Sequence, residues 1–279
     1  MIAIPLPPIF VAVLLMAAAA VTDGARAGSA GWAEAAHSAV RLIAAPAPAP
    51  EAAERQAGVE LRLDPGWKTY WRYPGDSGIP PRFDFSGSDN VDAVTIAWPA
   101  PKRLVDETGV TIGYKGAVVF PLAVRLLDPA KPATLRLKLE YGVCEKLCIP
   151  AEAEATLDLT APDAAGAAAL AAAAKHVPKK AALGAPGPLA VTRLARTAPD
   201  QAAVEVRAPA GEHVALFVEG PGPDWALPVP EPATAGADGI ARFAFTLDGL
   251  PPGAAPTGAK LTLTATAAGH AVEVSAPLD

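Results

Sequence analysis

The chain of 279 residues is long enough for two ordinary domains, and its formal net charge of −6 argues against binding to a polyanion. No basic stripe with interleaved aromatic residues runs along it, so nucleic-acid recognition is not expected. After residue 21 no apolar stretch approaches the roughly 20 residues needed to cross a membrane, and we expect the mature chain to be soluble.

The N-terminal region has the pattern of a secretory leader. An apolar run at residues 9–21 is too short to span a bilayer, and the small-residue site Ala25-Arg26-Ala27 follows it. No lysine or arginine precedes the run, so the terminal amine supplies the positive charge of the leader. We predict a signal peptide over residues 1–27 and export to an oxidising compartment, where a disulfide can form and persist.

Residues 28–160 repeat short alternating or apolar stretches, separated by turns rich in Gly, Pro and Asx residues. The pattern predicts β-strands at 58–63, 67–73, 91–98, 118–127, 134–141 and 151–159. The Pro- and Ala-rich residues 44–53 are predicted to form a loop or strand connection. Many short strands without a long amphipathic helix indicate an antiparallel β-sandwich.

The second half is predicted to be a separate, smaller β-sandwich at residues 188–279. Its strands are expected at 203–207, 213–218, 240–247, 260–266 and 271–275. Residues 161–187, rich in Ala, Pro and Gly, are predicted to be an interdomain linker with a short helix at 164–176. The second half contains no cysteine and two scattered histidines, so a structural or docking role is expected rather than a catalytic one.

Cys144 and Cys148 are the only cysteines, and they lie between two stretches that alternate strictly, so they are predicted to cap a hairpin. Residues that flank a three-residue loop come within the separation that a disulfide needs. In the chain-entropy model, such a short bridge stabilises the fold by only about 2 kcal/mol. The spacing alone leaves redox chemistry and an inert bridge equally open, because exposed or strained disulfides are the labile ones.

Three stretches carry a family resemblance, namely 59–71, 98–122 and 139–152. Together they resemble the N-terminal periplasmic domain of the DsbD thiol:disulfide interchange reductases, over about residues 32–160. The resemblance implies an immunoglobulin-like β-sandwich with a redox-active cysteine pair. Residues 71–81 resemble a longer variant found in standalone and copper-stress-associated relatives, whose N-terminal region also holds a second sandwich.

The resemblance also implies roles for individual residues. Cys148 would be the sulfur that joins a partner, and Cys144 would resolve the mixed disulfide. Asp106, Glu107 and Tyr114 fall where cap-loop and active-site neighbours lie and would manage the proton; the alternative is two solvated turn charges and a packing tyrosine. The best-studied family pattern has more residues between its cysteines than the three found here. In the family, an aromatic residue of the cap loop shields the cysteines, but the matching region here, residues 105–110, has none. Either Tyr114 takes over this shielding, or the sulfurs are open to solvent.

The implied setting is the periplasm, and the implied partners are thioredoxin-like or disulfide-isomerase-type proteins. The family's membrane electron-transfer module and terminal thioredoxin-like domain are not found in the sequence, so a reductase of this kind would need a separate membrane electron donor. No cofactor is expected. Other catalytic templates are missing from the sequence, because no Gly-x-Ser-x-Gly, His-Glu-x-x-His or Walker loop occurs. The aromatic residues Trp67, Tyr70, Trp71 and Trp98 are interpreted as core and rim packing rather than a docking surface.

Two alternatives remain open at this point. The Cys-x3-Cys pattern resembles the copper-binding motif of thioredoxin-fold copper chaperones, and the thiolates of Cys144 and Cys148 suit Cu(I). However, strands flank the motif here, and the four histidines are scattered. The other alternative is a non-catalytic immunoglobulin-like adaptor whose disulfide only rigidifies a hairpin.

Overall fold

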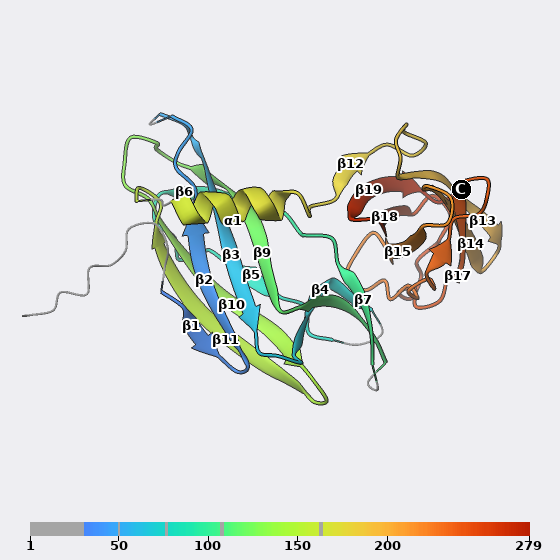
Figure 1. Cartoon of the computed structure of the whole chain (residues 1–279), viewed down its shortest axis with the longest axis horizontal. Helices are drawn as coiled ribbons and strands as arrows, with labels where there is room; N and C mark the ends of the chain where they lie inside the picture. Colours follow the sequence, from blue (N-terminus) through green and yellow to red (C-terminus); the bar gives the residue numbers. More distant parts are fainter. Residues whose placement is uncertain (1–30, 50, 76–77, 107–108, 162–163) are drawn as a thin grey trace, which may run out of the picture.

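The computed structural model describes residues 31–279 except 50, 76–77, 107–108 and 162–163, and the predicted signal peptide lies outside these residues. Two β-sandwiches lie beside each other, with the N-terminal one on the left of Figure 1. Each has its own buried apolar cluster. The prediction of an all-β chain, with an immunoglobulin-like sandwich followed by a second one, is confirmed.

The first sandwich consists of two antiparallel sheets. One sheet contains, in spatial order, β1 (Ala33–Ala35), β2 (Ser38–Ala44), β3 (Glu54–Leu63), β9 (Ala117–Leu126) and β6 (Val91–Ile96). The other contains β11 (Cys148–Asp158), β10 (Thr134–Cys144), β4 (Lys68–Gly75), β8 (Gly109–Lys115) and β7 (Lys102–Asp106), with β5 (Arg82–Asp84) paired to β10. The core lies between the two sheets, where the inward residues of both alternate with outward polar ones.

Alternation in β10 explains how the cysteines are placed. Leu135, Leu137 and Leu139 are buried in the core, whereas the residues between them point outward and are exposed. The same period continues through β11, which pairs with β10 along its whole length. The predicted hairpin is therefore confirmed, and Cys144 and Cys148 form its last cross-strand pair.

The helix α1 (Ala164–Ala174) forms within the segment predicted to be a linker, and it packs on the first sandwich. It lies across β9, β2 and β3 (Figure 1). Leu170 is buried over Gly58, where an added Cβ would lie only 2.6 Å from the Leu170 Cδ2 atom. Alanine on the rest of the helix allows its backbone to approach the sheet closely, which explains why this Ala-rich segment packs. After the helix, β12 (Lys179–Ala181) already pairs with the second sandwich.

The second sandwich has one sheet of β12, β19 (His270–Pro277), β18 (Lys260–Ala267), β15 (His213–Glu219) and β16 (Ala233–Thr234). The facing sheet contains β13 (Ala190–Ala198), β14 (Gln201–Arg207) and β17 (Ile240–Thr246). Apart from the parallel pair of β12 and β19, the strands pair in antiparallel fashion. Predicted strands in this half correspond to β14, β15, β17, β18 and β19.

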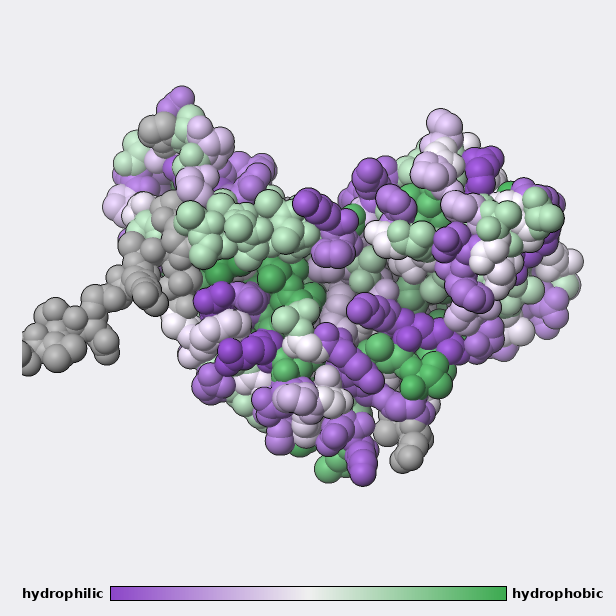
Figure 2. Space-filling model, viewed as in Figure 1, coloured by the Kyte–Doolittle hydropathy of each residue, from purple (hydrophilic) through white to green (hydrophobic). Residues whose placement is uncertain are grey.

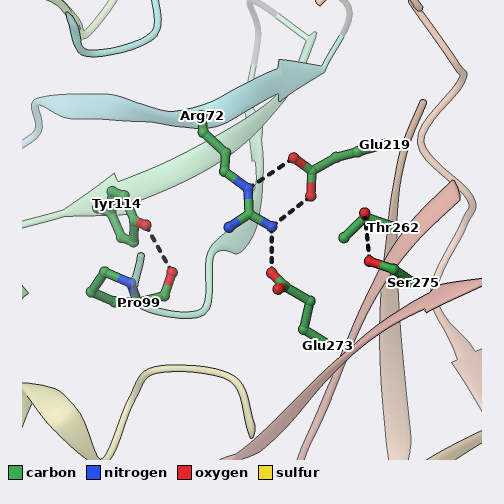
Figure 3. A network of polar contacts seen from close by, with 7 residues as sticks. All are labelled: Arg72, Pro99, Tyr114, Glu219, Thr262, Glu273 and Ser275. Carbon is green, nitrogen blue, oxygen red and sulfur yellow. Dashed lines mark hydrogen bonds and ion pairs between the residues drawn. The ribbon is translucent and has the colours of Figure 1, made fainter. Parts of the chain in front are cut away.

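A partly buried ion cluster joins the two sandwiches (Figure 3). Arg72 of β4 donates hydrogen bonds to both carboxylate oxygens of Glu219 at 2.7 and 2.8 Å, and to Glu273 at 2.5 Å. Burial lowers the pKa of Arg72, but the hydrogen bonds and charges of the two glutamates outweigh it and leave the pKa above its ordinary value. Next to the cluster, Trp71 packs against Phe217 with ring centroids 5.8 Å apart.

Candidate functional site

The candidate site is the disulfide between Cys144 and Cys148 at the end of the β10–β11 hairpin. Their Cα atoms are 4.1 Å apart, because the two residues face each other across the ladder. The two cysteines differ in exposure: Cys144 is completely buried, whereas Cys148 lies on the exposed side of the hairpin. A molecule approaching from solvent therefore meets Cys148 first.

A tyrosine hydroxyl contacts the exposed cysteine. The Tyr70 Oη atom lies 3.0 Å from the Cys148 Sγ atom, and because a disulfide sulfur carries no hydrogen, the hydroxyl is the donor. The ring reaches across β10 at Gly142, where an added Cβ would lie 2.9 Å from the Tyr70 Cε2 atom. Gly142 therefore leaves the space through which Tyr70 of β4 reaches a sulfur on β11, one strand beyond β10.

Tyr70 remains a hydrogen-bond donor over a wide pH range. Burial of its hydroxyl, and then the negative charge of Asp106, raise the pKa of Tyr70 above its ordinary value of 10.0. The phenol is thus protonated at neutral pH and can donate to a sulfur lone pair, either of the disulfide or of a thiolate.

A buried charge pair lies beside the second cysteine. Lys68 of β4 is the cross-strand neighbour of Cys144, and its side chain is only 1% exposed. The Lys68 Nζ atom contacts the Asp106 carboxylate at 2.8 Å, which compensates the buried ammonium group. The site therefore contains a cation, an anion and a phenol around two sulfurs.

Three residues were proposed from the sequence as neighbours of the cysteines, and they do not share one location in the structure. Asp106, at the end of β7, is brought to the site through Lys68. Glu107 lies outside the described residues. Tyr114 points elsewhere: its hydroxyl donates to the Pro99 carbonyl oxygen at 2.8 Å (Figure 3), and its ring packs edge-on against Phe120 in the core. Burial raises the pKa of Tyr114 well above its ordinary value.

The aromatic residue over the sulfurs is Tyr70, which the sequence analysis assigned to packing. Tyr70 and Lys68 were missed as site residues because their partners are distant in the chain, 78 residues away for Cys148 and 38 for Asp106. One signal was present in the sequence: Lys68 and Tyr70 alternate with Trp71, so both lie on the face of the strand opposite the core.

Among the described residues, no group of three or more His, Cys, Asp or Glu side chains is placed to hold a metal ion. Within the same residues, no helix has the length and apolar character required to cross a membrane.

The first sandwich carries a disulfide at one hairpin end, with one cysteine exposed and the other buried. Residues 39–160 match the family model described as "Thiol:disulfide interchange protein DsbD, N-terminal". Over these residues the chain matches that family, which confirms the resemblance seen in the sequence.

One solved structure has a similar fold over most of the chain, beyond the residues that the family model matches. The N-terminal periplasmic domain of ScsB from Proteus mirabilis is similar with a TM-score of 0.73 and 22% identity, covering 90% of this chain and 98% of that one. At this identity the likeness concerns the fold, and it includes both sandwiches.

Two further structures are much less similar. A protein of unknown function from Porphyromonas gingivalis W83 has a TM-score of 0.22 with 13% identity, covering 87% of this chain and 100% of that one. The adhesin domain of Epf from Streptococcus pyogenes has a TM-score of 0.23 with 11% identity, covering 86% and 76%. No match is found among curated proteins.

Proposed function

We propose that the protein is a periplasmic thiol–disulfide exchange protein that passes reducing equivalents through Cys144 and Cys148 to partner proteins. The observation that carries the proposal is the asymmetry of the pair, in which Cys148 is exposed and Cys144 is fully buried. Exchange needs one accessible sulfur for a partner and a second one held close by for resolution.

The reaction begins from the reduced protein. The Cys148 thiolate attacks one sulfur of a partner disulfide, that bond breaks, and a mixed disulfide forms while the departing partner sulfur takes up a proton. The Cys144 thiolate then attacks the Cys148 sulfur, which restores the intramolecular disulfide and releases the partner's second thiolate. Two electrons pass to the partner, and a separate thiol donor, for which a membrane protein is the expected source, reduces the pair again.

The groups around the sulfurs suit these steps. The Tyr70 hydroxyl, 3.0 Å from Cys148, can stabilise the attacking thiolate by donating a hydrogen bond. Lys68 lies opposite Cys144 and places a positive charge near the resolving sulfur, which favours its thiolate form. Asp106 forms an ion pair with Lys68 and balances that charge in part.

Exposed apolar side chains flank the site and suit contact with a thioredoxin-like or isomerase-type partner. Leu147, in the loop between the cysteines, is 73% exposed, and Val105 of β7 is 64% exposed. An inert bridge gains no comparable support, because Cys148 is accessible.

A redox titration tests the proposal. The purified protein is equilibrated in thiol buffers, its free cysteines are alkylated, and the products are counted by mass spectrometry. We expect a midpoint above about −300 mV, in the range of known exchangers. A potential well below that value would leave the bond inert to biological thiols and would contradict the relay.

A Tyr70→Phe variant tests the role of the phenol. It keeps the ring over Gly142 but removes the donor to Cys148, so the pKa of the reduced thiol should rise and its alkylation at neutral pH should slow by about tenfold, as expected for a hydrogen bond to a charged group. The rate is followed with iodoacetamide. Tyr114→Phe is the matched control, because its hydroxyl bonds to Pro99 instead. Equal rates in both variants would remove Tyr70 from the mechanism.

A further inference from the structure

A cleft of about 690 Å³ lies between the two sandwiches, beside the C-terminal end of α1. Figure 2 shows this hollow between the two halves, with hydrophilic residues along its edge. Its walls come from both sides, with Val118 of β9 and Ala173 of α1 on one side and Val214 of β15 and Ala271 of β19 on the other. The volume falls in the range of small-ligand sites, and the walls are mainly apolar.

Both charged residues that line the cleft, Lys102 and Lys175, are cations. Three histidines, His176, His213 and His270, add ring nitrogens that can form hydrogen bonds. No Asp or Glu is among the lining residues, although the protein as a whole carries a net charge of −6. Lysines at an apolar cleft without a carboxylate attract anions and repel cations. The chemistry of the lining therefore matches a ligand that is apolar along its body and negative at one end.

The cleft is preformed by contacts that hold its walls. The Ala100 backbone N–H donates to the His176 carbonyl oxygen at 2.7 Å, which fixes the chain after α1 against the first sandwich. The contacts of Arg72 with Glu219 and Glu273 hold the two sandwiches together. A ligand would thus enter an ordered site and avoid much of the entropic cost of arranging it.

We propose that this cleft binds an organic anion with an apolar body, of the class of medium-chain alkyl carboxylates. The alkyl chain lies against the alanine and valine walls, and the carboxylate lies at the lysine and histidine edge. Neither cysteine nor Tyr70 lines the cleft, so this site is independent of the redox chemistry.

Calorimetric titration of the purified protein with three probes of equal chain length tests the proposal. Decanoate is expected to bind saturably with one equivalent per chain, decanol more weakly, and decyltrimethylammonium at least about tenfold more weakly than decanoate. Equal binding of the three probes, or saturation by none of them, would overturn the proposal.

Variants locate the binding. Ala172→Trp fills the cleft from an exposed position on α1 and should weaken decanoate binding by about tenfold or more, whereas Ala171→Trp, exposed on the same helix but outside the lining, should not. Lys175→Glu should weaken it by about fivefold and Lys180→Glu, which is outside the lining, should not. Unchanged affinity in Ala172→Trp, or a protein dimer that this variant abolishes in sedimentation, would show that a ligand of this class does not occupy the cleft.

Discussion

A Cys144→Ala variant is expected to accumulate as a covalent complex with an oxidised thioredoxin-like protein. Cys148 remains exposed and can form the mixed disulfide, but the sulfur that resolves it is gone. Because a neighbouring thiol acts at a far higher effective concentration than one in solution, the lifetime of the complex should increase by at least about 100-fold. Non-reducing electrophoresis after quenching with acid measures the complex.

The Cys148→Ala variant is the matched control for this trap. It keeps a single thiol at Cys144, which is fully buried, and it should form little complex. If Cys148→Ala were the variant that traps the partner, the assignment of the two sulfurs would be reversed. If neither variant formed a complex, the exchange function itself would be contradicted.

An Arg72→Ala variant is expected to lose about 3 kcal/mol of unfolding free energy. Removal of the guanidinium leaves Glu219 and Glu273 close together, each with a side chain less than a fifth exposed, and without the cation that compensates them. Urea unfolding followed by tryptophan fluorescence measures the loss. Adding Glu219→Gln and Glu273→Gln to the variant should recover part of it, because the uncompensated charges are then absent.

Arg125→Ala is the matched control for the ion cluster. Arg125 pairs with Asp92 at 2.5 Å, but both side chains are more than a third exposed, so the loss should stay below about 1 kcal/mol. A loss in Arg72→Ala no larger than in this control would mean that the interface between the sandwiches is held by its apolar contacts, such as Trp71 against Phe217.

The alternation of apolar and polar residues was sufficient to predict the part of the site that lies within the β10–β11 hairpin. The strict alternation before Cys144 and after Cys148 predicts β10 and β11 and therefore the pairing of the two cysteines. The strands at 38–44 and 102–106 were not predicted, because their burial follows no simple alternation that distinguishes them from a loop.

The rest of the site depends on contacts that are remote in the chain. Tyr70 reaches Cys148 only because β4 lies next to β10 in the sheet and because Gly142 leaves space between them. Lys68 is buried only because the β7–β8 hairpin brings Asp106 to it. Neither strand order nor the shape of a hairpin can be derived from the period of a single segment.

The position of Cys144 directly opposite Cys148 in the ladder bears on how a partner protein would distinguish the two redox states. Since Cys144 and Cys148 already face each other in a continuous ladder, we expect that opening the bond leaves the adjoining backbone pairs, such as Val143 with Ile149, in place. The proposed exchange would then require little rearrangement. We therefore expect the oxidised and reduced proteins to have nearly the same outline, so that a partner would distinguish them by the state of the sulfur itself.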